Sequence, residues 1–298
     1  MPAIAIIGAG LIGASWAALF TARGHDVLAW DPAAAARADF AVRTRSMQRQ
    51  LRPLGLKGKG RIGVVATLAE AVRDAIWIQE NGPELIPLKR ALYAEIEAAN
   101  KRAIIASSTS SFQWSQLSQG MKRPGRLIVA HPFNPPHLVP LVEIYARSKP
   151  VADQAFAFYE AMGKVPIRIR REAPGHVANR LASALWREAV NIVAEGIADV
   201  ADVDKALVEG PGLRWAIQGA HMTYHLGGGP GGIAHYLEHL GPSQEKRWAS
   251  LGNPKLDAST RQKLIRGVAR EAAGRSIADL AAERDAMLLA LLKLKARK

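Results

Sequence analysis

The segment from His131 to Glu143 contains the two side chains best suited to move a proton near neutral pH. A neutral histidine can take the proton of an alcohol, and a carboxylate bonded to its other ring nitrogen fixes the tautomer and stabilises the imidazolium. Four prolines lie between the two residues, so the segment cannot be helical and must follow an extended, turning path. We expect that path to bring Glu143 back beside His131, although an isolated pair of this kind is more often a plain hydrogen bond.

A glycine-rich loop near the start of the chain predicts a nucleotide site. The apolar run 3–7 leads directly into Gly8-Ala9-Gly10-Leu11-Ile12-Gly13, and a helical pattern follows. This order of strand, G-x-G-x-x-G and helix is the dinucleotide fingerprint, in which the three glycines permit the tight turn, the approach of the pyrophosphate and the packing of helix on strand. The expected cofactor contacts in the loop are Gly8, Gly10, Leu11, Ile12 and Gly13.

The predicted second strand, 26–30, ends at an acidic residue, Asp31. Asp31 lies about 20 residues beyond the glycine loop, where the fingerprint places a carboxylate for the ribose hydroxyls. Because a carboxylate there repels a 2′-phosphate, Asp31 favours NAD over NADP.

Three further predicted strands end in polar residues. The runs 75–79, 103–106 and 127–130 lead into 80–84, 107–111 and His131. In a doubly wound parallel sheet the carboxyl ends of the strands form the edge where ligands bind. We therefore predict an α/β fold, a Rossmann-type doubly wound parallel sheet in residues 1–172.

The pattern changes after Pro174-Gly175. Strand signals stop, and apolar residues recur every four positions from Val177 onward, as on one face of a helix. We predict that residues 173–298 form an all-α domain for substrate binding and dimerisation. The apolar seam of its last helix comprises Ile277, Leu280, Met287, Leu288, Leu291 and Leu292 and suggests a homodimer, with an internal core helix as the alternative.

Composition limits the class of protein. The chain has 298 residues, 49% of them hydrophobic, which is enough for two domains. It has no cysteine, so disulfides, thiolate nucleophiles and cysteine metal sites are excluded, and a reducing compartment is compatible. We expect no metal site. No apolar run reaches the roughly 20 residues needed to span a membrane, and the immediate strand-like start indicates no signal peptide, so we expect a cytoplasmic protein. The net charge of +14 suggests an acidic ligand, but no nucleic-acid motif accompanies it.

These motifs together resemble the 3-hydroxyacyl-CoA dehydrogenase superfamily over nearly the whole chain. The resemblance rests on the glycine loop, the segment 79–84, the serine cluster 107–111, the segment 131–143 and Asn179-Arg180. Segments 13–16 and 210–215 look most like the lambda-crystallin/L-gulonate 3-dehydrogenase branch, and the carnitine dehydrogenases share the second.

The resemblance implies roles for individual residues. It makes His131 the catalytic base, Glu143 its partner, Ser110 a ligand of the substrate oxygen and Asn179 the residue that completes the site. It also implies that Glu84 and Lys89 contact NAD. One departure is His176, where the family usually has an aromatic ring.

The implied reaction is the NAD-dependent oxidation of a 3-hydroxy acid, and two substrate classes stay open. A small free acid such as L-gulonate or carnitine would be gripped by Arg214, since a guanidinium bonds a carboxylate through two parallel hydrogen bonds. Trp215 and Tyr224 could flank a trimethylammonium group. The alternative is a 3-hydroxyacyl-CoA, whose phosphates the basic run 43–61 could meet. A non-catalytic structural or nucleic-acid-binding role is the weakest interpretation.

Overall fold

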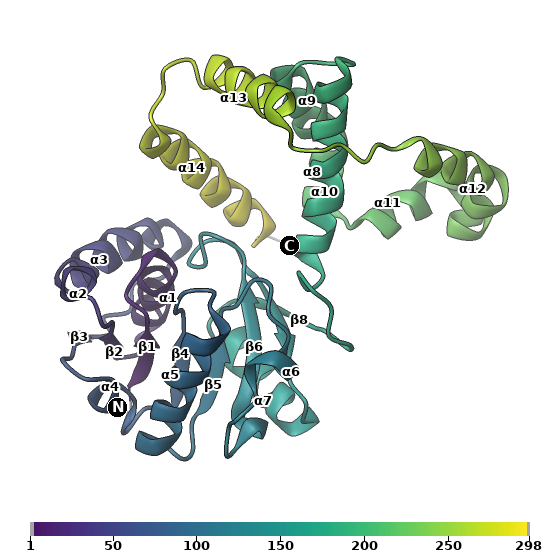
Figure 1. Cartoon of the computed structure of the whole chain (residues 1–298). Coiled ribbons are helices and arrows are strands. Elements are labelled where there is room, and N and C mark those ends of the chain that lie inside the picture. The colour runs from purple at the N-terminus through teal and green to yellow at the C-terminus, as the bar shows by residue number, and fades with distance from the viewer. Residues whose placement is uncertain (1–2, 297–298) are drawn as a thin grey trace. The chain divides into compact units, whose positions relative to one another are not determined.

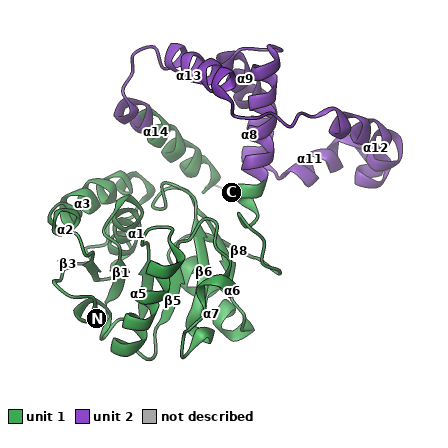
Figure 2. Ribbon diagram, viewed as in Figure 1, with its two compact units in different colours: residues 1–180, 283–298 green, residues 181–282 purple. Residues whose placement is uncertain are grey.

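The computed structural model describes residues 3–296, which form two compact units (Figure 1; Figure 2). The first unit comprises residues 1–180 and 283–298, and the second comprises residues 181–282. The sequence places the boundary near 172 and the whole last helix in the helical domain. In the structure the second half of that helix belongs to the first unit because Leu289 and Leu292 pack against its core.

The first unit is built on a sheet of eight strands in the order β3-β2-β1-β4-β5-β6-β7-β8, counted over residues 3–296. The strands are β1 (Ile4–Ile7), β2 (Val27–Trp30), β3 (Ile62–Val64), β4 (Trp77–Glu80), β5 (Ile104–Ser107), β6 (Leu127–Pro132), β7 (Leu141–Tyr145) and β8 (Val165–Arg168). The predicted doubly wound, mostly parallel sheet is confirmed.

Strand β7 is the departure from a parallel sheet, since it pairs antiparallel with β6. Only residues 133–140 join the two strands. A connection this short cannot make the crossover that a parallel pair requires, so the chain turns back on itself. This hairpin sets His131 opposite Glu143 in the strand register.

Helices cover both faces of the sheet (Figure 1). They are α1 (Leu11–Ala22), α2 (Ala34–Ala38), α3 (Phe40–Gln50), α4 (Leu68–Val72), α5 (Ile86–Ala99), α6 (Trp114–Leu117) and α7 (Lys149–Ala161), with 3-10 turns η1 (Arg52–Leu54) and η2 (Pro124–Arg126). Strand β1 is buried on both sides: Ile4 and Ile6 join one apolar cluster, and Ala5 and Ile7 join the other. This alternation follows from the two-residue period of a strand.

The second unit is helical, as predicted. Its elements are α8 (Ala178–Glu195), α9 (Val200–Leu207), the π-turn η3 (Val208–Gly212), α10 (Leu213–Ile217), α11 (Ala220–Gly227), the 3-10 turn η4 (Gly229–Gly231), α12 (Gly232–Ser250) and α13 (Ala258–Ala272), and α14 (Ile277–Lys295) leads from this unit back to the first. Among the described helices, none is both long and apolar enough to cross a membrane.

Candidate active site

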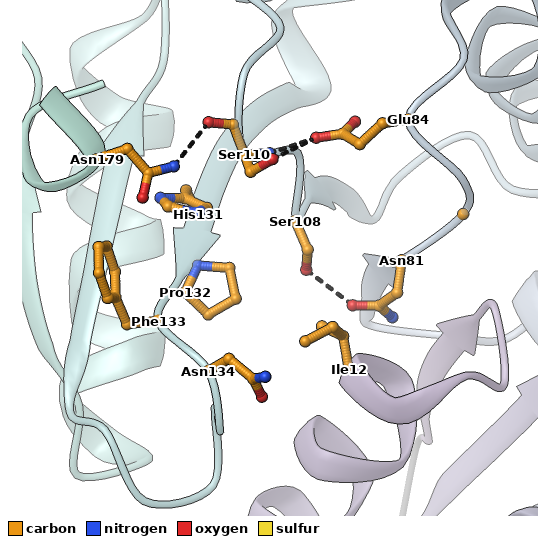
Figure 3. A pocket seen from close by; sticks show the side chains of 11 residues that line it. Ile12, Asn81, Glu84, Ser108, Ser110, His131, Pro132, Phe133, Asn134 and Asn179 are labelled. Carbon is orange, nitrogen blue, oxygen red and sulfur yellow. Dashed lines mark hydrogen bonds between the residues drawn. The ribbon is translucent and has the colours of Figure 1, made fainter. Parts of the chain in front are cut away.

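A cavity of about 480 Å³ opens at the carboxyl ends of the strands in the first unit (Figure 3). It is lined by Ile12, Asn81, Gly82, Glu84, Ser108, Ser110, His131, Pro132, Phe133, Asn134 and Asn179. Five of the predicted site residues are in this lining: Ile12, Glu84, Ser110, His131 and Asn179. The sheet edge predicted from the polar strand ends therefore borders a cavity.

The histidine and the glutamate form a buried pair. The Nδ1 atom of His131 lies 2.8 Å from Oε2 of Glu143, and both side chains are almost fully buried. A carboxylate accepts at this distance, so the proton resides on Nδ1 when the ring is neutral, and Nε2 is left with a lone pair. His131 is thus set up as a base whose free nitrogen can take a proton.

The second carboxylate oxygen of Glu143 is held by backbone. The N–H groups of Val177 and Ala178 donate to Oε1 at 2.8 and 2.9 Å. Burial alone would raise the pKa of Glu143, but the hydrogen bond with His131 and these two N–H groups outweigh burial and lower the pKa. Glu143 therefore stays ionised at neutral pH and can stabilise a positive charge on His131.

Ser110, Asn179 and Glu84 form a connected group on the cavity wall (Figure 3). The backbone N–H of Ser110 donates to Oε1 of Glu84 at 2.5 Å, and its hydroxyl donates to the same oxygen at 3.0 Å. The carbonyl oxygen of Ser110 accepts from Nδ2 of Asn179 at 3.2 Å. Ser110 and Asn179, which lie far apart in the sequence, are thereby held beside His131.

The glycine loop leaves room for a nucleotide at Gly10. A methyl group on Gly10 would meet no atom within 4 Å, whereas one on Gly13 would overlap the carbonyl oxygen of Gly8. Gly10 is also the N-cap of α1 and supplies no side-chain cap. The first N–H groups of the helix therefore face an open approach, which suits the pyrophosphate of NAD.

Asp31 lies against the same loop. Its Oδ2 accepts from the backbone N–H of Ala9 at 2.8 Å, and its Oδ1 accepts from that of Ala33 at 2.9 Å. Both bonds use one lone pair of each oxygen, so the carboxylate keeps acceptor capacity for ribose hydroxyls. Asp31 also holds the loop in place, a structural role that the fingerprint alone does not reveal.

Lys89, a predicted cofactor residue, is buried and does not line the cavity. Its amino group is buried and pairs with Glu80 at 2.8 Å, while Glu84 lies 3.7 Å away. The Tyr93 hydroxyl donates to the other oxygen of Glu80 at 2.8 Å. Lys89 therefore fixes the segment that carries Glu84, and Lys89 itself does not line the cavity.

Six residues line the cavity without having been predicted as site residues: Asn81, Gly82, Ser108, Pro132, Phe133 and Asn134. The hydroxyl of Ser108 donates to Oδ1 of Asn81 at 2.7 Å, and the ring of Phe133 meets that of His131 edge-on at 5.4 Å. Asn81 and Ser108 sit in the polar clusters after β4 and β5, so their place at a strand end was the available signal.

The two remaining residues of interest lie in different units. His176 is buried with its ring 5.2 Å from that of His131, and its Nε2 lies 3.2 Å from the carbonyl oxygen of Thr109. Burial and the neighbouring His131 lower the pKa of His176. Arg214 is exposed on α10 of the second unit.

Comparison with known proteins identifies the family. Residues 3–173 match the 3-hydroxyacyl-CoA dehydrogenase NAD-binding domain, and residues 175–267 match the 3-hydroxyacyl-CoA dehydrogenase C-terminal domain. The L-carnitine dehydrogenase of Streptomyces griseus is 47% identical, with 99% of this chain and 90% of that protein aligned, and the one from Oceanobacillus iheyensis is 40% identical, with 99% and 98% aligned.

A solved relative points the same way. The NAD+-dependent 5-formyl-3-hydroxy-2-methylpyridine 4-carboxylic acid 5-dehydrogenase superposes with a TM-score of 0.79 at 27% identity, over 99% of this chain and 98% of that one. The protein is an NAD-dependent dehydrogenase, as the resemblance implied, and NAD is the cofactor that the glycine loop and Asp31 predicted. The chain belongs to the 3-hydroxyacyl-CoA dehydrogenase family.

Proposed function

We propose that the protein oxidises a small free 3-hydroxy acid to the 3-keto acid, with L-carnitine as the first substrate to test. The observation that carries this proposal is the His131–Glu143 pair, because His131 lines a cavity in the unit that holds the glycine loop. The relatives named L-carnitine dehydrogenase align with almost the whole chain at 40–47% identity, which favours a free acid over a CoA thioester.

His131 acts as the general base in the oxidation. Its Nε2 takes the proton of the substrate hydroxyl as the hydride leaves the same carbon, and Glu143 stabilises the imidazolium that forms. The glycine loop at the start of α1 would hold NAD, which would supply the hydride acceptor. In the reverse direction the His131 imidazolium donates its proton to the ketone oxygen.

Ser110 and Asn179 hold the reacting oxygen. Asn179 donates one side-chain N–H to the carbonyl oxygen of Ser110, and its second side-chain N–H stays available to the substrate. The Ser110 hydroxyl donates to Glu84 here, so it must turn away from that carboxylate to donate to the substrate. Donors of this kind stabilise the transition state because the oxygen gains negative charge as its proton leaves.

The decisive experiment measures NAD reduction with L-carnitine, L-gulonate, 3-hydroxybutyrate and 3-hydroxybutyryl-CoA. We expect a free acid to give the highest kcat/KM, and efficient turnover of only the CoA thioester would replace this proposal with the acyl-CoA activity. His131→Ala should lose at least about 100-fold in kcat while binding NADH normally, since general acid–base groups contribute about that much.

Arg214 is the proposed ligand of the substrate carboxylate. It is exposed on a short helix, together with Trp215, and Tyr224 follows on α11. Arg214→Ala should raise KM for the free acid with a smaller effect on any acyl-CoA. Trp215→Leu and Tyr224→Leu should weaken carnitine more than 3-hydroxybutyrate, because only carnitine carries a trimethylammonium group for a cation–π contact.

We further propose that the helical unit mediates a homodimer. Several of its large apolar side chains are more than half exposed, including Leu181, Trp186, Ile197, Ile217 and Trp248. Scattered apolar residues are normal on a surface, but this many in one small unit suggest a covered face. Sedimentation at micromolar concentration should give the mass of two chains, and a monomer would contradict the proposal.

We also propose that the enzyme is cytoplasmic. The chain contains no cysteine and so needs no oxidising compartment, and its NAD cosubstrate is an intracellular metabolite. Fractionation of cells that express the protein should recover the activity with cytoplasmic markers.

A further inference from the structure

The loop 133–140, which joins the two members of the His131–Glu143 pair, is anchored from behind. Its segment Pro135–Leu138 is buried, whereas Asn134 is exposed toward the cavity. Two titratable side chains hold the buried side, one within the loop and one from the start of β8. Neither belongs to the reaction described above.

His137 ties the loop to two helices. Its backbone N–H donates to Oγ of Ser15 at 2.8 Å, its Nδ1 lies 2.8 Å from the same oxygen, and its Nε2 lies 2.6 Å from Oε1 of Gln50. One proton arrangement satisfies all three contacts: Nε2–H donates to Gln50, and the Ser15 hydroxyl donates to Nδ1. The ring is therefore neutral, in line with its burial, which lowers the pKa of His137 to about 4.

Charges around His137 do not upset this arrangement. Asp285 and Arg284 of the last helix and Lys164 are its charged neighbours, and their influences are smaller than that of burial. Arg284 and Asp285 also pair with each other at 2.7 Å.

Lys164 clamps the loop on both sides of His137. Its Nζ donates to the carbonyl oxygen of Pro136 at 2.5 Å and to that of Val139, and the residue is 6% exposed. The same ammonium lies 5.2 Å from the ring centre of Trp16. Without Lys164 the carbonyl groups of buried Pro136 and half-buried Val139 would lose this donor, and buried carbonyl groups without a donor are rare in proteins.

Both anchors meet the helix that starts at the nucleotide loop. Ser15 and Trp16 lie in α1 about one helical turn after its N-cap, Gly10 of the glycine loop. Trp16 also donates through Nε1 to Ser108 on the cavity wall at 3.2 Å. The helix start, the cavity wall and the loop behind His131 are therefore one connected packing unit.

We propose that His137 and Lys164 are positioning residues for the dehydrogenase reaction. By anchoring the loop they fix where the His131 imidazole lies when the nicotinamide is bound. The inference rests on the proposed role of His131 as the base. It assigns no contact with substrate to either residue. Their effect travels through the loop backbone, where a displacement of about 1 Å at a reacting group can cost about 100-fold in rate.

The test compares Lys164→Met, His137→Asn and His137→Gln with Lys149→Met, which removes an exposed lysine from α7 and serves as the control. Asn keeps a group near Nδ1 for Ser15, and Gln keeps one near Nε2 for Gln50. We expect Lys164→Met to lower kcat at least about tenfold with NADH affinity within about threefold of wild type, and the deuterium isotope effect on kcat/KM to rise because hydride transfer becomes rate-limiting. The His137 variants should lose less than His137→Leu, since each keeps one anchor.

A double variant separates positioning from loss of folded protein. In a His131→Ala background, Lys164→Met should add no further loss of kcat, because there is no imidazole left to place. Additive losses, an unchanged isotope effect or a wild-type kcat in Lys164→Met would overturn the inference. If Lys164→Met does not fold, the milder Gln50→Leu carries the same expectations. Retention of activity by His131→Ala would instead reject the proposed function, so the two failures are distinguishable.

Discussion

Lys164 should make the stability of the protein rise with pH above neutrality. Burial lowers the pKa of this lysine from an ordinary value of 10.5 to about 7. Between these two values the unfolded chain binds a proton that the folded chain does not, so the free energy of unfolding increases with pH. The cost of burying the charged amine is complete below pH 7 and disappears as the pH approaches 10.5.

The size of the effect follows from the shift. Each pKa unit corresponds to about 1.4 kcal/mol, so the full window is worth roughly 5 kcal/mol, of which roughly 3 kcal/mol falls between about pH 7 and about pH 9.5. That is a large part of the stability of an ordinary domain. The amine keeps donating to Pro136 and Val139 when neutral, so the anchor persists across the titration.

Urea unfolding of wild type and Lys164→Met, followed by circular dichroism at a series of pH values, would measure this effect. Lys164→Met loses the buried hydrogen bonds at every pH, so its offset is constant, but it has no amine to titrate. The stability of wild type relative to the variant should therefore grow by roughly 3 kcal/mol between about pH 7 and about pH 9.5. A difference that stays constant across this range would refute the reasoning, and Lys149→Met should show such constancy as the control.

Three further predictions test the site. Glu143→Gln should lower kcat by about 10²- to 10⁴-fold at saturating substrate, because the neutral amide neither stabilises the imidazolium nor fixes the tautomer; a loss below about fivefold would remove Glu143 from the mechanism. Asp31→Ser should weaken NAD binding and reduce the preference for NAD over NADP, measured as the ratio of their kcat/KM values. Equal use of NAD and NADP by wild type would contradict the role of Asp31. Gly10→Ala should keep the wild-type melting temperature but bind NADH at least about tenfold more weakly in a titration. Gly13→Ala should instead lose stability, because only the methyl group added at Gly13 meets another atom of the chain. An unchanged NADH affinity in Gly10→Ala would count against the pyrophosphate site.

Much of the first unit could be predicted because its signals are local. The glycine loop, the strand before it and the acid after the second strand are contiguous patterns, each with a mechanical reason for its residue types. The polar ends of three predicted strands also identified the edge that borders the cavity. The prolines between His131 and Glu143 indicated that the chain turns there, and the family resemblance implied that the two side chains pair.

Other features could not be inferred from local pattern. The sequence did not predict strand β7, because the prolines before it favour an irregular path. Its antiparallel register with β6 is what brings His131 and Glu143 together. The resemblance implied that Lys89 contacts NAD, and in the structure its amino group pairs with Glu80 inside the protein, a contact between α5 and β4 that the pattern of neither segment indicates. The last helix divides between the units because Leu289 and Leu292 find apolar partners in the first.

The anchor behind the active-site loop could not be predicted from the sequence. His137 and Ser15 are 122 residues apart, and each alone is an ordinary buried polar residue. Their meeting depends on α1 and the β6–β7 hairpin packing on one another, which the pattern of neither segment encodes. The helix whose N-terminus would bind the NAD phosphates also holds, about one turn later, the loop that follows the base His131 of β6. The positions of the cofactor and the base therefore both depend on α1. A substitution in that helix should alter the rate of hydride transfer even at a position that contacts neither substrate nor NAD.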